Sequence, residues 1–321
     1  MEPTAKTKTV VGEQIHENQE TKGKIVEYLF YMEKQGYAKA TIKLHSTYLR
    51  VLEQCGANLA DPELVKEVLA KGKNTKWLIW SSNRKINLIN ASTMFLKFQN
   101  LQWQKPKCRP VRPVPFIPAE QELDSLIAGC GKKLSAFLQL LKETAMRSGE
   151  AKRLLWTEID TKTNTIRLNN PEKGSNPRMW QVSSTLLGML NALPKTHEQV
   201  FGAGPVGTMK STFWKTRKGL AYKLQNPRLL KISFHTFRHW KATMLYHEKP
   251  DTLYVRDFLG HKELRNTERY ITIARTIFGP GTNDKFIIKI AANAEEAIGL
   301  GENGFEPFDV VDGVRLYRKR K

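Results

Sequence analysis

The sequence lacks any long apolar segment. No run of eighteen apolar residues occurs in its 321 residues, so no transmembrane helix is predicted. The first twenty residues, MEPTAKTKTVVGEQIHENQE, contain no apolar core of the kind that a secretory signal peptide needs. We therefore expect a cytoplasmic globular protein, and its 40% hydrophobic composition and its length suit about two domains.

Cysteine is also scarce. Cys55, Cys108 and Cys130 are odd in number, widely spaced and without a CxxC pair. This pattern argues against a disulfide framework or a cysteine-type zinc site, and it predicts reduced, structural thiols. No cofactor is expected.

Acidic residues are few relative to basic ones. The chain has 52 Lys and Arg residues against 31 Asp and Glu residues, which gives a formal net charge of +21. Such an excess points to a polyanionic partner, and nucleic acid is the leading candidate because Lys and Arg displace the counterions condensed on phosphates. A basic surface that only confers solubility is the alternative.

Proline and glycine are rare in the N-terminal third, where apolar residues recur at helical spacing. Residues 1–20 are polar and unpatterned, and we expect them to be flexible. Residues 21–103 are predicted to form a small all-helical, DNA-binding domain. Its four predicted helices are 23–36, 39–56, 61–72 and 81–99.

Basic side chains on the polar faces of these helices are candidates for contacts with the DNA backbone. Each one alone is more often a solvated surface charge. The candidate DNA-binding residues are Lys39, Lys43, Arg50, Arg84 and Lys85.

Residues 104–118, QKPKCRPVRPVPFIP, contain five prolines and four basic residues. Because proline fixes φ and removes an N–H donor, the segment is predicted to be an extended linker. Residues 119–282 then form a second, mostly helical domain with a small antiparallel sheet, in which strands at 164–170 and 178–184 flank the turn PEKGSNP. Residues 283–321 are predicted to be a short β-α-β-β appendage. The fold class is thus mainly α, of the α+β type.

The segment FHTFRHWKATML places His235 and Arg238 three residues apart, on one face of a predicted helix. A purely structural pair would need a carboxylate about one helical turn away, and Glu248 and Asp251 lie beyond the centre of the helix. A metal site at His235 and His239 is the weaker alternative, because no glutamate lies between them and no third ligand is evident.

Three further pieces surround this motif. Arg147 lies at a predicted helix junction in ETAMRSGEAKR, His261 ends the segment FLGH, and Tyr270 follows His261 by nine residues. The order and spacing of Arg147, HxxR, LGH and the tyrosine resemble the tyrosine recombinase, or phage integrase, family. The resemblance covers residues 116–275 by motif, and the N-terminal helices are similar to the family's core-binding (SAM-like) domain. The segment LYVRDFLGHKELRNTERY is most similar to that of archaeal members of the family.

The resemblance also assigns a lysine in a β-hairpin loop, and Lys173 in PEKGSNPRMW is at the matching position, with Arg178 as a nearby cationic substitute. Two departures occur. Ala145 replaces the glycine of the family's Thr-Gly-x-Arg pattern, and Gly149 occupies a position where serine is usual. Both are expected to shift only backbone detail.

Phosphodiester chemistry explains why these residue types are needed. Two arginines can bind the non-bridging oxygens of a pentavalent phosphorus with forked, permanently charged donors. Tyr270 is the expected nucleophile, His235 its general base and Lys173 the general acid, while His261 donates a hydrogen bond to the phosphate. The predicted catalytic residues are Arg147, Lys173, His235, Arg238, His261 and Tyr270, and no metal ligand is predicted.

The expected activity is site-specific DNA recombination through a 3′-phosphotyrosyl intermediate, without metal or ATP. By resemblance, four protomers would act on two double-stranded DNA duplexes. Two alternatives remain: an enzyme similar to type IB topoisomerases, and a DNA-binding protein without activity. The sequence leaves open the target site, the choice among integration, excision and dimer resolution, whether Tyr270 acts in cis or in trans, and the role of the appendage.

Overall fold

The computed structural model describes residues 21–76, 78–110, 113–279, 286–311 and 314–320. The chain divides into two compact units, Met1–Pro113 and Val114–Lys321. The division falls inside the segment 104–118, and the described residues from 101 to 118 form neither helix nor strand. Residues 1–20, for which we expect flexibility, lie outside the described residues.

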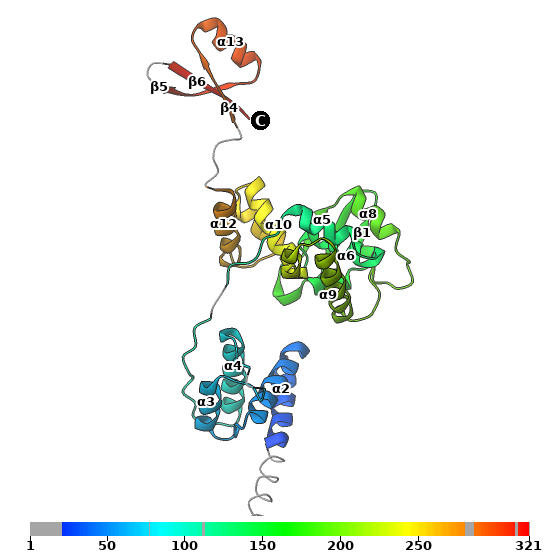
Figure 1. Ribbon diagram of the computed structural model, residues 1–321, viewed down its shortest axis with the longest axis vertical. Helices are drawn as coiled ribbons and strands as arrows, with labels where there is room; N and C mark the ends of the chain where they lie inside the picture. Colours follow the sequence, from blue (N-terminus) through cyan, green and yellow to red (C-terminus); the bar gives the residue numbers. More distant parts are fainter. Residues whose placement is uncertain (1–20, 77, 111–112, 280–285, 312–313, 321) are drawn as a thin grey trace, which may run out of the picture. The chain divides into compact units, whose positions relative to one another are not determined.

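The N-terminal unit is a helical bundle (Figure 1). A helix at 21–34 is followed by α2 (Lys39–Gln54), α3 (Pro62–Lys71) and α4 (Ser82–Phe98). The start of α3 follows from its sequence, because the Asp61 side chain accepts hydrogen bonds from the backbone N–H groups of the first turn and proline tolerates that turn. Buried Tyr28, Leu49 and Phe95 belong to the core of this unit.

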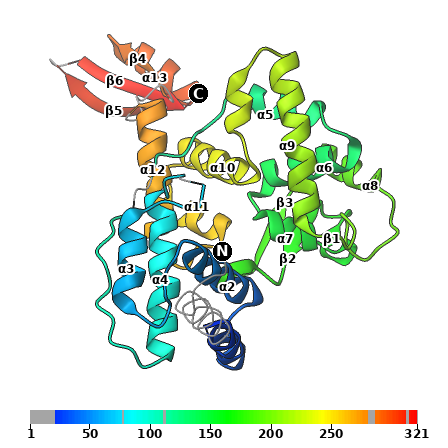
Figure 2. The same ribbon diagram turned by 60° about the horizontal axis from the view of Figure 1, so that its bottom comes forward.

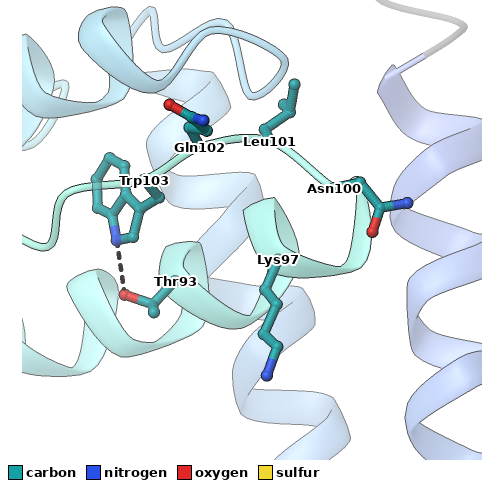
Figure 3. Close-up of a pocket in the computed structure, with 6 residues that line it drawn as sticks. All are labelled: Thr93, Lys97, Asn100, Leu101, Gln102 and Trp103. Carbon is teal, nitrogen blue, oxygen red and sulfur yellow. Dashed lines mark hydrogen bonds between the residues drawn. The ribbon is translucent and has the colours of Figure 1, made fainter.

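After α4 the chain folds back over its own helix. Asn100 turns in the left-handed region, with φ 57°, and Trp103 Nε1 donates a hydrogen bond of 2.9 Å to Thr93 Oγ1 (Figure 3). The return leaves a shallow surface pocket that Lys97 also lines (Figure 3). Its lining residues come from the end of α4 and the segment that follows it, and none belongs to the predicted catalytic set.

The C-terminal unit is built around two helices, α6 (Lys132–Thr144) and α10 (Phe234–Glu248), which pack on each other. Aromatic rings fill the contact: Phe137 meets Phe234 edge-on at 5.1 Å, and Phe213 stacks on Phe234 at 4.9 Å. Around this pair lie α5 (Glu120–Ala128), α7 (Ser148–Arg153), α8 (Ser184–Asn191), α9 (Val206–Lys223), α11 (Thr252–Leu259) and α12 (Arg265–Phe278) (Figure 2).

A small antiparallel sheet lies between α7 and α8 in sequence, in the order β1 (Ile159–Asp160), β2 (Thr165–Leu168), β3 (Arg178–Gln181). Alternation sets its faces, because Ile166 pairs with Trp180 and both side chains are buried. The sequence predicts β2 and β3 but not the two-residue strand β1, which is too short to show a periodic pattern.

The last described residues form β4 (Phe286–Ala291), α13 (Ala294–Glu302), β5 (Glu306–Val311) and β6 (Val314–Arg320). The sheet order is β4-β6-β5, all antiparallel, and the side chains of Tyr317 in β6 and of Phe305, just before β5, are buried. The mainly helical fold with small antiparallel sheets is confirmed. The sequence also predicts a hairpin turn at Asp312-Gly313 within the appendage, and these two residues lie outside the described residues.

Among the helices that the structure describes, none is long and apolar enough to span a lipid bilayer. Cys55, Cys108 and Cys130 are free thiols.

Candidate active site

Arg147 is placed by a sharp turn between α6 and α7. Helix α6 ends at Thr144, and Ala145 continues in the left-handed region with φ 53° and ψ 24°. A non-glycine residue there costs about 1–2 kcal/mol of backbone strain. The alanine is nevertheless accommodated, because its side chain packs fully buried in a cluster with Ala242 and Leu245 of α10. The turn is thus kept despite the departure from glycine.

Glu150 is the buried anion that organises this junction. Its carboxylate is fully buried, accepts hydrogen bonds from Arg147 N at 2.8 Å and Arg147 Nη1 at 2.9 Å, and pairs with Arg178 Nη2 at 2.9 Å. Burial raises the pKa of Glu150, but the Arg178 charge and backbone N–H donors outweigh burial, so its pKa lies below the ordinary value. The carboxylate is therefore charged and holds both arginines.

Arg238 projects from α10 into the protein and is only 2% exposed. Its Nη1 donates to the Ala145 carbonyl at 2.7 Å, and its Nη2 donates to the Leu259 carbonyl at 2.7 Å. Burial, with the nearby charges of Arg147 and Arg178, lowers its pKa to about 10, so the guanidinium remains charged at neutral pH. Two carbonyl dipoles thus orient a cation that an incoming anion would stabilise.

His261 follows Gly260, which ends α11 in the left-handed region with φ 67°. A Cβ at Gly260 would lie 2.7 Å from the Arg178 side chain, so both the backbone angle and the close approach require glycine. His261 Nε2 lies 3.0 Å from Arg238 Nη2, and its Nδ1 lies 3.0 Å from Thr267 Oγ1.

The hydrogen-bond partners define the tautomer of His261. Arginine only donates, so Nε2 accepts from Arg238 and the proton resides on Nδ1, which faces Thr267. Burial, with the nearby Arg238 charge, lowers the pKa of His261 to about 3. In this arrangement Nε2 is an acceptor. From the sequence we expect His261 to donate a hydrogen bond to the phosphate. This donation requires Arg238 Nη2 to move away from His261 Nε2 and Nε2 to gain a proton.

Tyr270 lies on α12, which packs against α10, and it is 3% exposed. Its hydroxyl is 3.0 Å from Nδ1 of His239, one helical turn after His235. Burial raises the pKa of Tyr270, although Arg238 and Arg269 oppose the rise. Burial lowers the pKa of His239 to about 3, with a contribution from His235, so its imidazole is neutral.

The sequence motif singles out His239 only as a partner of His235 in the weaker metal-site alternative. Its position directly after the HxxR arginine was the available signal, but its partner becomes apparent only once α12 packs on α10. No group of His, Cys, Asp and Glu side chains suited to a metal occurs in the part of the chain that the structure describes.

His235 is exposed, and its ring lies 4.4 Å from that of His239. Desolvation by the surrounding protein, followed by the charges of Arg238 and Arg147, lowers the pKa of His235 to about 4. A groove of about 340 Å³ begins here and is lined on its other side by Trp214 and Arg217 of α9.

Helix α9 has five basic residues and no acidic one, a signal that the sequence analysis overlooked. Trp214 is 54% exposed, and the ammonium of Lys218 lies 5.7 Å from its ring. Basic side chains interleaved with an exposed aromatic ring suit a nucleic-acid surface.

Lys173 lies in the loop between β2 and β3 and is exposed. It is close enough to His235 for its charge to contribute to the lowered pKa of that residue. Arg178, the possible substitute, instead points inward: its side chain is 3% exposed, it pairs with Glu150, and its Nη1 donates to the Leu259 carbonyl at 2.5 Å. Lys173 is therefore the accessible cation of this loop.

The five candidate DNA-binding residues lie in the N-terminal unit. Lys39, Lys43 and Arg50 are exposed on α2 at spacings that place them on one side of the helix. Arg84 and Lys85 lie in the first turn of α4, and α2 contacts α4 through a hydrogen bond of 3.3 Å from Asn87 to Tyr48. Their role stays a prediction.

Known proteins resemble this chain in sequence and fold. A model of the phage integrase family matches residues 119–276. The tyrosine recombinase XerA of Thermococcus onnurineus (strain NA1) is 23% identical over 260 residues, which cover 78% of this chain and 90% of that protein. XerA of Pyrococcus horikoshii (strain ATCC 700860 / DSM 12428 / JCM 9974 / NBRC 100139 / OT-3) is 23% identical, covering 77% and 88%.

Two solved structures share the fold. A lambda integrase tetramer bound to a Holliday junction has a TM-score of 0.59 at 12% identity and covers 78% of this chain and 76% of that chain. The Tn1549 transposon integrase in complex with transposon right end DNA has a TM-score of 0.59 at 17% identity, covering 79% and 98%.

Proposed function

Through residues 119–276 the chain belongs to the phage integrase family and is a tyrosine-type site-specific recombinase, and on this premise we propose that it cleaves and rejoins double-stranded DNA through a 3′-phosphotyrosyl intermediate. One observation supports the proposal above others. The hydroxyl of Tyr270, a residue on α12, meets a histidine of α10 beside the charged, buried guanidinium of Arg238.

The charged side chains around Arg238 are suited to bind one phosphate. Arg147, Arg178, Arg238 and Lys173 contribute positive charge. Glu150 contributes a negative charge and contacts two of these arginines, Arg147 and Arg178. The excess favours an anion, and two forked guanidinium groups match the two non-bridging oxygens of a phosphodiester. Removing one such donor from a transition state typically costs about 10²–10³ in rate.

The tyrosine must lose its proton as it attacks. In the proposed step, Tyr270 Oη forms a bond to phosphorus while its proton passes to His239 Nδ1, which lies 3.0 Å from the hydroxyl. The ring of His235, the base expected from the sequence, lies 4.4 Å from that of His239. Both rings are neutral acceptors because their pKa values are lowered to about 3 and about 4.

The bond from phosphorus to the 5′ oxygen breaks, and Lys173 gives a proton to the leaving 5′ oxygen, which departs as a 5′-hydroxyl. The phosphotyrosyl link retains the energy of a phosphodiester, so a 5′-hydroxyl from another strand can reverse the reaction without ATP. The same chemistry serves integration, excision or resolution of DNA dimers.

We further propose that Tyr270 attacks in cis, because its hydroxyl contacts His239 of its own chain. The relatives' structures include a tetramer on a Holliday junction, which supports a homotetramer acting on two duplexes here. Lys39, Lys43, Arg50, Arg84 and Lys85, together with α9, would contact the DNA phosphates.

The test is incubation with a nicked suicide duplex that carries a candidate site, in EDTA, followed by a denaturing gel. Wild type should form a band of protein linked to DNA, and Tyr270→Phe, which keeps the ring and removes the nucleophile, should not. Supercoil relaxation without strand exchange would favour the topoisomerase alternative. Tight, salt-sensitive binding without a covalent band on any site-containing DNA would refute the proposed cleavage activity and favour an inactive DNA-binding protein.

A further inference from the structure

We propose that Glu172 and Arg153 are positioning residues for Lys173: their ion pair, seated over Gly149, holds the loop between β2 and β3 so that the lysine reaches the leaving oxygen. This inference rests on the proposed function, in which Lys173 is the general acid. Neither residue touches the reacting atoms, so their effect passes through the loop.

The loop around Lys173 is held by hydrogen bonds between its backbone and the side chains of Glu150 and Arg147. Glu172 N donates to Glu150 Oε1 at 3.0 Å, and Arg147 Nη1 donates to the Glu172 carbonyl at 3.3 Å and to Ser175 Oγ at 2.7 Å. Lys173 itself is exposed and has φ 56°, so burial of its own side chain does not hold it in place. Its position depends on the residues beside it.

The side chain of Glu172 adds a separate anchor outside the buried cluster. Its Oε1 lies 2.8 Å from Arg153 Nη1 at the end of α7, with side-chain exposures of 29% and 55%. An ion pair this exposed shifts an equilibrium by no more than about fivefold. It is therefore too weak to hold the fold together, but strong enough to bias one exposed loop between two conformations.

Gly149 explains how the carboxylate fits. A Cβ at this position would clash with Glu172 Oε1, so the carboxylate occupies the space that a side chain at 149 would take. The glycine at position 149, where the family usually has serine, therefore leaves room for the Glu172 carboxylate that pairs with Arg153. Any residue with a Cβ at 149 requires the Glu172 carboxylate to move from this position, which in the proposal weakens its ion pair with Arg153.

The experiment compares two suicide substrates, one ordinary and one with sulfur in place of the bridging 5′ oxygen. In both, Tyr270 Oη bonds to phosphorus and the bridging bond breaks. The oxygen leaving group needs the proton of Lys173, whereas a thiolate leaves without one. Lys173→Ala should therefore be slow on oxygen and restored on sulfur, which calibrates the assay.

Glu172→Ala and Gly149→Ser should each slow cleavage of the oxygen substrate about threefold to fivefold and leave the sulfur substrate unchanged. The double variant should be no slower than Glu172→Ala alone, because both changes break the same ion pair. Glu120→Ala, which removes an exposed ion pair to Lys142 elsewhere in the unit, is the control and should have no effect. Equal losses on both substrates, or additive losses in the double variant, would overturn the proposal.

A second measurement needs no DNA. Trypsin cleaves after Lys173 when the loop opens, so the rate of nicking at Lys173 should rise about threefold to fivefold in Glu172→Ala and Gly149→Ser but not in Glu120→Ala. An unchanged rate of trypsin cleavage at Lys173 in these two variants would refute the proposal that the Glu172–Arg153 ion pair holds the loop. If wild type formed no covalent product with either substrate, the proposed function would fail, and the nicking rates would still decide whether Glu172 holds the loop.

Discussion

Replacing Glu150 with glutamine should destabilise the C-terminal unit strongly. The substitution keeps the shape of the side chain and removes the charge that pairs with Arg178, whose own side chain is 3% exposed. Breaking a buried ion pair by removing one partner costs about 3–5 kcal/mol, because the other charge stays buried without compensation. We expect a loss of that size in the free energy of unfolding at pH 7.

Urea denaturation, followed by tryptophan fluorescence, measures this loss. Glu120→Gln is the matched control: Glu120 pairs with Lys142 at a similar distance of 2.8 Å, but its side chain is 56% exposed. The control should lose no more than about 1 kcal/mol. If Glu150→Gln lost no more than the control, the argument that Glu150 organises the arginines would be wrong.

The pH dependence gives a second check. The folded-state pKa of Glu150 lies below its ordinary value, so its stabilising effect is complete above the unfolded-state pKa, about 4.3, and is lost as pH falls through the folded-state pKa. The stability difference between wild type and Glu150→Gln should therefore be constant from pH 8 to 6 and shrink below about pH 4. A difference that grew on acidification would contradict the assigned direction.

Two further predictions concern the tyrosine. Replacing His239 with asparagine should slow covalent-complex formation at least about tenfold and shift its pH profile upward, because Tyr270 would then lose its proton to solvent. An unchanged profile in single-turnover assays across pH 6–9 would remove His239 from the mechanism. Mixing Tyr270→Phe with Lys173→Ala protein should yield no more covalent complex than either variant alone, since attack in cis needs both residues in one chain. Recovery of the covalent band in the mixture would show attack in trans.

Apolar spacing and turn residues were sufficient to predict the four helices of the N-terminal unit and the strands β2 and β3. The catalytic roles came from the family resemblance and stay a prediction. Apolar spacing and end signals such as Asp61 and Gly72 fall within a residue or two of the observed helix ends, because capping is a property of a few neighbouring residues. The short strand β1 was missed for the opposite reason. Its two residues have no periodicity, and pairing with β2 alone defines it.

The sequence by itself determined the charge excess, the order of helices, and the motif formed by Arg147, His235, Arg238, His261 and Tyr270. The tertiary structure alone decided the partners. Packing of α12 on α10 places the tyrosine against His239, and the inward course of β3 buries Arg178 on Glu150 and leaves Lys173 exposed. Residue type and spacing are local properties of the chain, whereas hydrogen-bond partners and desolvation depend on segments that meet only after folding.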